Sequence, residues 1–386
     1  TLVPTNQVKV WVASWTINTG KLPTMTSGTS YYISSSGTDN ATPTGNVEGF
    51  GSVRGSTFTF NSVPPTSWFS APRDGSYVAS LASVNGTAAA AFSNVALSTV
   101  SLSLRNASLA GPNNCYAPNG GFTNACPGWF KAFGSMSAWN FVFNNAALFT
   151  HASSYVLLSS ATDVANNVQV ALSSAGFTFD QFAPTATLTT AQWIKASVTA
   201  FGGTSTDAPA GISSLGVALS SAGGAANSWW DASSFSGPNA VYFATTTYNV
   251  GAAGDTWTWN RPALTNGQTY LLRTNTTDYA GNNWLRDQPT VTFDNAVPTA
   301  GIQKPVGGGF YNSLATISGT GADNLTVSTI ALSIQNVTIP APNCYSEASG
   351  LFNVACPPDA AGLFPAKGTV GAWTYSGINW TSQNQY

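Results

Sequence analysis

Charged side chains are scarce in this sequence. Asp, Glu, Lys and Arg together make up 7% of its 386 residues, and the formal net charge is −2. A nucleic-acid-binding protein neutralises phosphates with a surplus of Lys and Arg, so this composition argues against that class. Solubility must come instead from the many Ser, Thr, Asn and Gly residues.

Helical patterns and long apolar runs are also missing. Few Glu, Lys or Leu recur at helical spacing, and no apolar run approaches the ~20 residues of a membrane-spanning helix. The composition is not that of a disordered chain, because 43% of the residues are hydrophobic and 12% are aromatic. The chain begins with Thr1 rather than Met and shows no signal-like segment there, so we expect a processed or excised chain. We expect folded β-domains without a membrane span.

The sequence contains a single histidine, His151, just before an expected strand. It has no acidic or cysteine partner nearby in the sequence, and no nucleophile-elbow motif marks a Ser-His-Asp site. We interpret it as a surface residue of a turn. The 14 acidic residues are thinly spread, and nothing indicates a catalytic carboxylate pair. We therefore expect that the protein is not an enzyme.

Only four cysteines are present, in two close pairs: Cys115 with Cys126, and Cys344 with Cys356. Each pair opens with Asn-Cys-Tyr and closes with Ala-Cys-Pro. The spacing is not Cys-x-x-Cys and no histidine accompanies it, which disfavours zinc. We expect local disulfides and hence an oxidising, extracellular setting, with unpaired buried cysteines as the alternative.

A seven-residue phrase recurs three times, as 60–66 (FNSVPPT), 179–185 (FDQFAPT) and 293–299 (FDNAVPT). Its prolines Pro65, Pro184 and Pro298 are 119 and 114 residues apart, a period that indicates tandem copies of one domain. We take these prolines as linker residues. The expected boundaries are a partial domain at 1–63, complete domains at 64–182 and 183–296, and a domain at 297–386 without its last two strands.

When the copies are aligned at the proline of the recurring phrase, the same features follow in the same order. Each has an alternating strand whose aliphatic side chains share one face, then a long excursion, an aromatic strand, a strand opened by Tyr, an Asp/Asn turn and a last strand. In the first full copy these features are 97–104, 115–130, 139–141, 155–158, 162–167 and the strand that reaches Phe179. About seven short strands in about 115 residues, with a strand-borne Trp, predict an all-β fold of tandem immunoglobulin-like antiparallel sandwiches in a rod-like array.

The segment Thr-Asp-x-Ala-Gly-Asn followed by Phe-Asp-x-x-x-Pro-Thr, best seen in 270–299, resembles the tandem bacterial Ig-like domains of very large surface and extracellular repeat proteins. In 155–185 Asn166 replaces the Gly. The resemblance covers the whole chain and implies a stalk, an adhesin or a filament. Such motifs specify a scaffold and carry no reaction.

Ig-type repeats of surface proteins often bind calcium at their linkers. The candidate ligands are Asp163 with Asp180, and Asp278 with Asp294. Each pair offers too few carboxylates for the roughly 6–8 oxygen ligands of calcium unless backbone carbonyls contribute. We interpret these residues as turn caps and expect no cofactor, with inter-domain calcium as the open alternative.

The two ends of the sequence match different parts of the repeat. Trp15 and Tyr31 have the spacing of Trp139 and Tyr155, so 11–60 matches the back of a sandwich. In the copy at 297–386, Trp373 and Tyr386 have the spacing of Trp257 and Tyr270, and the sequence stops at that tyrosine, so we expect the last two strands to be absent. One hypothesis is that 31–60 of one subunit completes 297–386 of the next, head to tail. The other is that the chain is a window of a longer repeat protein, which the aromatic strands at both ends favour somewhat.

The exchange hypothesis assigns two sets of residues. The donor strands contain Tyr31, Ile33, Phe58 and Phe60. The acceptor domain contains Leu332, Ile334, Trp373, Tyr375 and Tyr386. The partners are therefore copies of the same chain in a polymer, or the flanking repeats of a longer chain.

Aromatic residues of the excursions offer a different function. They are Trp129, Phe130, Trp229, Trp230 and Phe352. They could stack on sugar rings, but their recurrence at one repeat position favours packing. We predict a non-enzymatic extracellular structural protein that forms or extends a filament or stalk at the cell surface. The alternative is an adhesin or carbohydrate-binding array.

Overall fold

The structure, a computed structural model, describes residues 20, 22–49, 55–135, 137–145, 147–245, 255–357, 362–369, 371–381 and 384. Every named element of this part is a β-strand, which confirms the all-β prediction. Within it, no helix has the length and apolarity needed to cross a membrane. Trp15 and Tyr386, which the sequence alignment used, lie outside the described residues.

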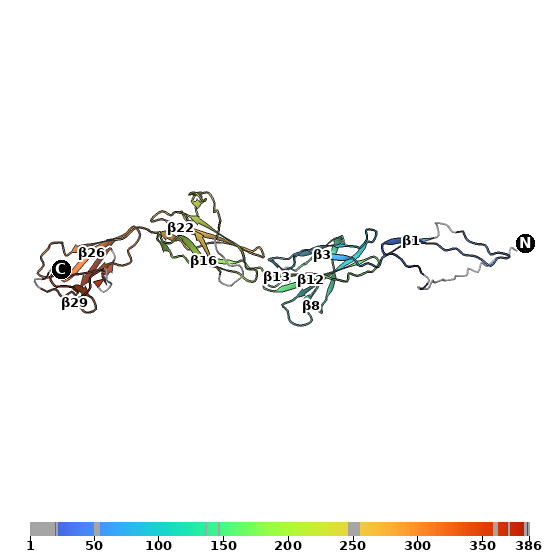
Figure 1. Cartoon of the computed structure of the whole chain (residues 1–386), viewed down its shortest axis with the longest axis horizontal. Helices are drawn as coiled ribbons and strands as arrows, with labels where there is room; N and C mark the ends of the chain where they lie inside the picture. Colours follow the sequence, from blue (N-terminus) through green and yellow to red (C-terminus); the bar gives the residue numbers. More distant parts are fainter. Residues whose placement is uncertain are drawn as a thin grey trace. The chain divides into compact units, whose positions relative to one another are not determined.

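The chain divides into two compact units. Unit 1 comprises Thr1–Ala183, Ala208–Ala210 and Tyr279–Asn282, and unit 2 comprises Pro184–Asp207, Gly211–Asp278 and Asn283–Tyr386. Below, repeat A is 64–182, repeat B is 183–296, repeat C is 297–386, and the N-terminal hairpin is Thr29–Phe60. Figure 1 labels strands of each.

Repeat A is a sandwich of two sheets (Figure 1). One sheet has the order β10-β11-β5-β3. The other has the order β4-β13-β12-β6-β7-β8, and β9 also pairs with β6; all pairs are antiparallel except β4 with β13. The bounds are β3 Thr66–Ala71, β4 Ser76–Val78, β5 Ser83–Ala89, β6 Leu97–Asn106, β7 Cys115–Ala117, β8 Gly121–Asn124, β9 Trp129–Lys131, β10 Phe133–Ser135, β11 Ala138–Val142, β12 Ser154–Asp163 and β13 Ser173–Phe179.

The alternation of apolar residues builds the core between these sheets. On β6, Val100, Leu102 and Leu104 are all fully buried, because successive odd or even residues of a strand share a face. The neighbouring strand β12 of the same sheet adds Tyr155 and Leu157 to this core; they are 1% and 0% exposed. The central strand pair of the larger sheet, β6 with β12, therefore supplies much of the core.

Repeat B is a sandwich of the same kind. Its sheets have the orders β14-β16-β21 and β15-β24-β22-β17-β18-β19, with β20 on β17 and β23 on β22. The bounds are β14 Thr185–Leu188, β15 Trp193–Ile194, β16 Ala200–Thr206, β17 Ile212–Ser220, β18 Trp229–Trp230, β19 Phe235–Gly237, β20 Phe243–Ala244, β21 Asp255–Asn260, β22 Thr269–Asp278, β23 Asn283–Asp287 and β24 Val291–Phe293.

Repeat C contains a four-stranded sheet that corresponds to the smaller sheet of repeats A and B. Of the larger sheet, its described residues form only short strands. The sheet orders are β25-β26-β32-β31, β27-β30 and β28-β29. The bounds are β25 Thr299–Lys304, β26 Thr316–Ala322, β27 Ala331–Leu332, β28 Cys344–Ser346, β29 Leu351–Val354, β30 Phe364–Pro365, β31 Lys367–Thr369 and β32 Ala372–Ser376. The four-stranded sheet packs its Trp373 and Tyr375 against Leu332 and Phe364.

One glycine in each repeat faces a tryptophan. A Cβ on Gly86, Gly203 or Gly319 would overlap the six-membered ring of a buried indole from the aromatic strand, as well as a backbone carbonyl of the edge strand. The three indoles are Trp139, Trp257 and Trp373, each at most 2% exposed. Glycine at this position lets the indole lie flat against the neighbouring strand.

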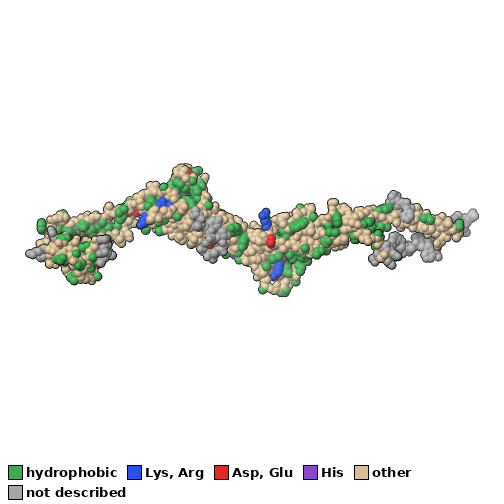
Figure 2. Space-filling view, in the orientation of Figure 1, with side chains coloured by type: hydrophobic (Ala, Val, Ile, Leu, Met, Phe, Trp, Pro, Cys, Tyr) green, Lys and Arg blue, Asp and Glu red, His purple; other side chains and the backbone are tan. Residues whose placement is uncertain are grey.

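The surface of each repeat reflects the composition. In Figure 2 most of the visible surface is backbone or side chains that are neither charged nor hydrophobic, interspersed with hydrophobic side chains, and acidic and basic groups are few. Among the described residues a close Arg–carboxylate pair joins Arg273 to Asp287 at 2.5 Å, and this bond raises the pKa of Arg273 and lowers that of Asp287. Charge pairing is therefore a minor contributor to the fold.

Candidate interaction site: the N-terminal hairpin and repeat C

The N-terminal hairpin consists of β1 (Thr29–Ile33) and β2 (Ser56–Phe60), paired antiparallel with Tyr31 opposite Phe58. The two rings stack at 5.7 Å between centroids. The Tyr31 hydroxyl accepts a hydrogen bond from Thr26 N at 2.8 Å, and Gly28 N donates to Phe60 O at 2.8 Å. The hairpin therefore has a defined register.

The last strand pairs of repeats A and B have the same local geometry. In repeat A, Tyr155 lies opposite Phe177, and its hydroxyl accepts from Thr150 N at 2.8 Å. In repeat B, Tyr270 lies opposite Val291, and its hydroxyl accepts from Thr265 N at 2.8 Å. Cross-strand hydroxyl pairs also recur one residue before each tyrosine: Ser30–Thr59 at 2.8 Å, Ser154–Thr178 at 3.1 Å and Thr269–Thr292 at 2.8 Å.

The turn that follows the first strand is repeated as well. The carboxylate of Asp39 accepts from Ala41 N, Asn46 N and Asn46 Nδ2 at 2.6–3.0 Å. In repeat A, Asp163 accepts from Ala165 N, Asn167 N and Asn167 Nδ2 at 2.9–3.0 Å. The side chain of Asn46 and the two backbone N–H groups hold the pKa of Asp39 below its usual range. Hairpin and turn together reproduce the closing strands of a sandwich.

The side chains of the hairpin are less buried than the equivalent side chains in the closing strands of repeat A. Leu157 of repeat A is fully buried, whereas Ile33 at the equivalent position is 48% exposed. Phe177 is 3% exposed, whereas Phe58 is only half-buried. Side chains that the closing strands of repeat A bury in the core are therefore only partly covered in the hairpin.

Repeat C differs from repeat A in the strand pairing of its alternating segment. In repeat A, β6 pairs along its length with β12 on one side. In repeat C, the equivalent β27 is two residues long, and its only strand partner in the described part is β30. Leu332, Trp373 and Tyr375 are 2–7% exposed and Ile334 packs against them. Burial, with a hydrogen-bond contribution from Tyr345, raises the pKa of Tyr375.

Asn61 attaches the hairpin to repeat A within unit 1. Its Nδ2 donates to Oδ2 of Asp163 at 2.6 Å, and its carbonyl accepts from Asn167 Nδ2 at 3.0 Å. Asn94 Nδ2 donates to Gly28 O at 2.9 Å. Of the linker prolines, Pro65 and Pro184 are buried, whereas Pro298 is exposed.

The structure does not bring together the predicted calcium pairs. Asp163 ends β12 and Asp180 follows β13, next to the start of β12, so the two lie at opposite ends of a ten-residue strand, roughly 30 Å apart. Asp278 and Asp294 are separated in the same way along β22. The carboxylate of Asp163 is occupied by N–H donors from the protein, as expected for a turn cap.

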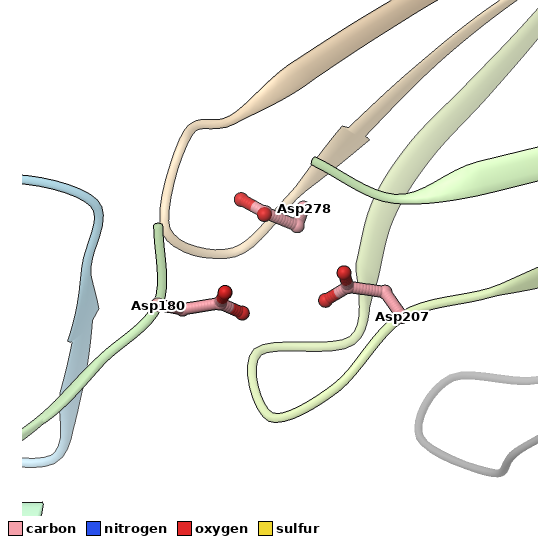
Figure 3. Close-up of side chains that lie close together, drawn as sticks. All are labelled: Asp180, Asp207 and Asp278. Carbon is pink, nitrogen blue, oxygen red and sulfur yellow. The ribbon is translucent and has the colours of Figure 1, made fainter. Parts of the chain in front are cut away.

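Other aspartates lie nearer to one another. In unit 2, carboxylate oxygens of Asp207 and Asp278 lie within 4.8 Å of each other (Figure 3). Figure 3 also labels Asp180, which belongs to unit 1. There its Oδ2 accepts from Ala210 N, and its carbonyl accepts from Asn282 Nδ2, each at 2.9 Å.

His151 has an acidic partner that is distant in the sequence. Its Nδ1 lies 3.2 Å from Oδ1 of Asp180, and its ring lies 4.2 Å from that of Phe182. The side chain of Asp180 is fully buried and that of His151 is 22% exposed. His151 does lie in a turn, and its partner comes from the end of β13, which pairs with the strand that follows the turn. Strand pairing, not sequence proximity, creates the contact.

Both predicted disulfides are present. They join Cys115 to Cys126 and Cys344 to Cys356. Of the excursion aromatics, Phe130 and Trp229 are buried at 7% and 2% exposure, whereas Trp129 is 43% exposed. Most of this set therefore packs within its own repeat.

The chain was compared with known proteins. No protein-family model matches it, and no curated protein matches it significantly. Among solved structures, a tetra-tandem repeat in the extending region of a large adhesion protein aligns with 82% of this chain and 66% of its own length, at 16% identity and a TM-score of 0.25.

Two further structures align comparably. A 1.5-MDa bacterial ice-binding adhesin aligns with 82% of this chain and 88% of its own, at 12% identity and a TM-score of 0.27. The FN1–FN3 domains of chicken CNTN1 align with 65% of this chain and 75% of their own, at 11% identity and a TM-score of 0.27. The assignment of Ig-like sandwiches rests on the strands and sheets described above.

Proposed function

We propose that this protein is an extracellular or cell-surface structural repeat protein whose subunits join head to tail by strand complementation. In this arrangement the N-terminal hairpin of one copy completes repeat C of the next. The supporting observation is that the hairpin has the register and hydrogen bonds of a sandwich's closing strands, while its Ile33 is 48% exposed and its Phe58 is only half-buried. A head-to-tail contact of this kind propagates into a filament. The proposal assigns no catalytic role.

The pairing of β12 with β6 in repeat A predicts the register of the joint. There Tyr155 lies opposite Asn106, Leu157 opposite Leu104 and Ser159 opposite Leu102. The equivalent pairs between two copies are Tyr31 with Asn336, Ile33 with Ile334, and Ser35 with Leu332. Backbone hydrogen bonds would then supply affinity and the apolar side chains specificity, as in other cases of strand addition.

The setting follows from the disulfides. Structural disulfides persist in oxidising compartments, and two of them in a chain with few charges fit an extracellular or surface location. Burial of most excursion aromatics disfavours the alternative of a carbohydrate-binding array, because stacking on sugar needs an exposed ring. The exposed Trp129 alone does not establish such an array.

Engineered cysteines test the joint. A chain carrying Ile33→Cys is mixed with a chain carrying Ile334→Cys, and we expect an intermolecular disulfide detectable by mass spectrometry of the non-reduced peptides. The matched control is Tyr32→Cys with Ile334→Cys, because Tyr32 points to the opposite face of the strand. Equal cross-linking of the two pairs, or a chain that sediments as a monomer at all accessible concentrations, would overturn the proposal.

A further inference from the structure

The residue after the phenylalanine of each recurring phrase forms the same turn. These junction residues are Asn61, Asp180 and Asp294, and Oδ1 of each accepts a hydrogen bond from the N–H two residues further on, at 3.1, 3.2 and 3.1 Å. This bond sets the orientation of the side chain. The second atom of each head group therefore has an equivalent position, and it is Nδ2 in Asn61 but Oδ2 in the two aspartates.

In unit 1 an Asp/Asn turn covers each junction residue. Asn61 donates from Nδ2 to Oδ2 of Asp163 at 2.6 Å, and its carbonyl accepts from Asn167 Nδ2 at 3.0 Å. The carbonyl of Asp180 accepts from Asn282 Nδ2 at 2.9 Å in the same way. The two junction residues are 8% and 0% exposed. The turn therefore does more than close its own strand pair, because it also covers the residue that precedes its repeat.

The same two elements are more exposed in the linker before repeat C and in the N-terminal hairpin. Asp294 is partly exposed, and Val297 beyond it is 84% exposed. In the hairpin turn, Asp39 and Asn46 are exposed, whereas the equivalent Asp163 is fully buried. The linker and the turn are the two halves of the contact that is formed within unit 1.

The register of the proposed joint brings these halves to the same end of a sandwich. Asp39 follows Tyr31 by eight residues, as Asp163 follows Tyr155. In repeat A this spacing places the turn at the end where the chain enters the repeat, because the turn contacts Asn61 there. A hairpin that pairs with repeat C in the same register places its turn at the entrance of repeat C.

Resting on the proposed function, we infer that the Asp39–Asn46 turn of one copy covers the linker at Asp294 of the next copy. Asn46 donates from Nδ2 to the carbonyl of Asp294, as Asn167 does to the carbonyl of Asn61. The hairpin thus contacts the next copy at two places, which are the strands of repeat C and the linker that precedes them.

One atom distinguishes this contact from its counterpart in unit 1. Asn61 presents an amide Nδ2 to the carboxylate of Asp163, whereas Asp294 presents a carboxylate oxygen to the carboxylate of Asp39. An amide donates a hydrogen bond to a carboxylate, whereas two carboxylates in contact repel each other. Asp294 is therefore the residue that limits the affinity of the joint.

A single-joint assay isolates this contact. A donor chain carries Ile334→Asp, which blocks its own repeat C, and an acceptor chain carries Ile33→Asp, which blocks its own hairpin. The dissociation constant of the pair is measured by sedimentation velocity. We expect Asp294→Asn in the acceptor to strengthen binding about tenfold, because an amide then faces the carboxylate of Asp39. Asn46→Ala in the donor should weaken binding about fivefold, because the carbonyl of residue 294 loses a hydrogen-bond donor.

The coupling between residues 39 and 294 decides the assignment. With Asp39→Asn in the donor, Asp294→Asn should change the dissociation constant by less than about twofold, because no carboxylate remains to accept from the new amide. An equal gain with both donors would mean that Asp294 acts on the fold of the acceptor, and would overturn the assignment. Asp231→Asn in the acceptor is the matched control, because it makes the same isosteric change in a turn of repeat B and should leave binding unchanged.

The outcomes separate this inference from the proposed function. If neither the parent acceptor nor its Asp294→Asn variant binds the donor, the proposed function itself fails. A complex that forms but responds to neither Asp294→Asn nor Asn46→Ala contradicts only the contact between turn and linker. Asn46→Ala also removes a bond to Asp39 within the hairpin, so the coupling measurement takes precedence where the two results differ.

Discussion

The N-terminal hairpin and the closing strands of repeat A are two copies of one local structure in different surroundings. Their tyrosines, cross-strand hydroxyl pairs and Asp turns superpose in register and hydrogen bonding. They differ in what covers them, since Ile33 is 48% exposed and Leu157 is fully buried. Local sequence is therefore sufficient to specify the strand pair, whereas its burial depends on a partner sheet. A strand pair that stands alone is only marginally stable, so a partner is where its stability would come from.

The largest expected difference concerns the core phenylalanines. Phe177→Ala should lower the unfolding free energy of repeat A by about 3–5 kcal/mol, because it leaves a cavity in a packed core. Phe58→Ala at the equivalent position should cost less than about 1 kcal/mol in a monomeric chain, because the ring is not enclosed. Urea denaturation at low protein concentration measures both. Similar losses would mean that the hairpin is already covered within its own chain.

The residue that follows each strand pair is a second point of difference. It is Asn61 after the hairpin and Asp180 after β13. Asn61→Asp replaces the donor to the buried Asp163 with another carboxylate, and we expect a loss of about 2–3 kcal/mol at neutral pH. The loss should shrink as the pH falls toward the acidic range, because the folded variant then binds a proton that relieves the repulsion.

Asn61→Ala is the control for this change, since it removes the donor without adding charge. Its loss of stability should not depend on pH over the same range. Thermal unfolding of both variants from neutral to mildly acidic pH measures the difference. Parallel pH profiles would contradict the contact between residues 61 and 163.

The tyrosine hydroxyls give a smaller contrast. Tyr155→Phe should cost about 1 kcal/mol, because Thr150 N loses its partner beside the core. Tyr31→Phe removes the same bond, to Thr26 N, at an exposed site, where water can replace it. We expect less than about half that loss. Hydrogen exchange of the two threonine amides reports each bond directly, and equal protection changes would show that exposure is not the deciding factor.

The smallest effect concerns the Asp39 turn. Its depressed pKa means that the charged carboxylate stabilises the turn at pH values above the unfolded value of about 3.9. This contribution is lost as the pH falls through the lower, folded pKa. Amide chemical shifts of Ala41 and Asn46 should therefore move below about pH 4. Asp39→Asn should abolish that movement; a titration that persists in the variant would assign it to another group.

Periodic patterns made most of the fold predictable. The alternating segment at 97–104 lies in β6, the aromatic segment at 139–141 lies in β11, and Tyr155 is the second residue of β12. The cysteine pairs were predictable because each closes a short loop between recurring residues. These features depend on neighbours in the sequence, which is why local patterns report them.

Contacts between distant segments were not predictable in the same way. The sequence pairs Asp163 with Asp180 as candidate calcium ligands at a linker, but the two residues lie at opposite ends of the same strand pair. The partner of Asp163 from a distant segment is Asn61, which precedes the repeat. His151 and Asp180 meet only because β12 and β13 are antiparallel neighbours. These contacts can be predicted only when the pairing register of the strands is known. That register depends on the whole sheet rather than on any one segment.

The glycine that faces each buried indole restricts how these repeats can change. Any side chain at Gly203 would overlap both the ring of Trp257 and a backbone carbonyl, and a smaller residue at 257 would leave a void that glycine does not fill. A substitution at either position alone should therefore cause a large loss of stability. The two must be replaced together or kept, so a search for distant copies of this domain should look for the paired residues rather than for either one.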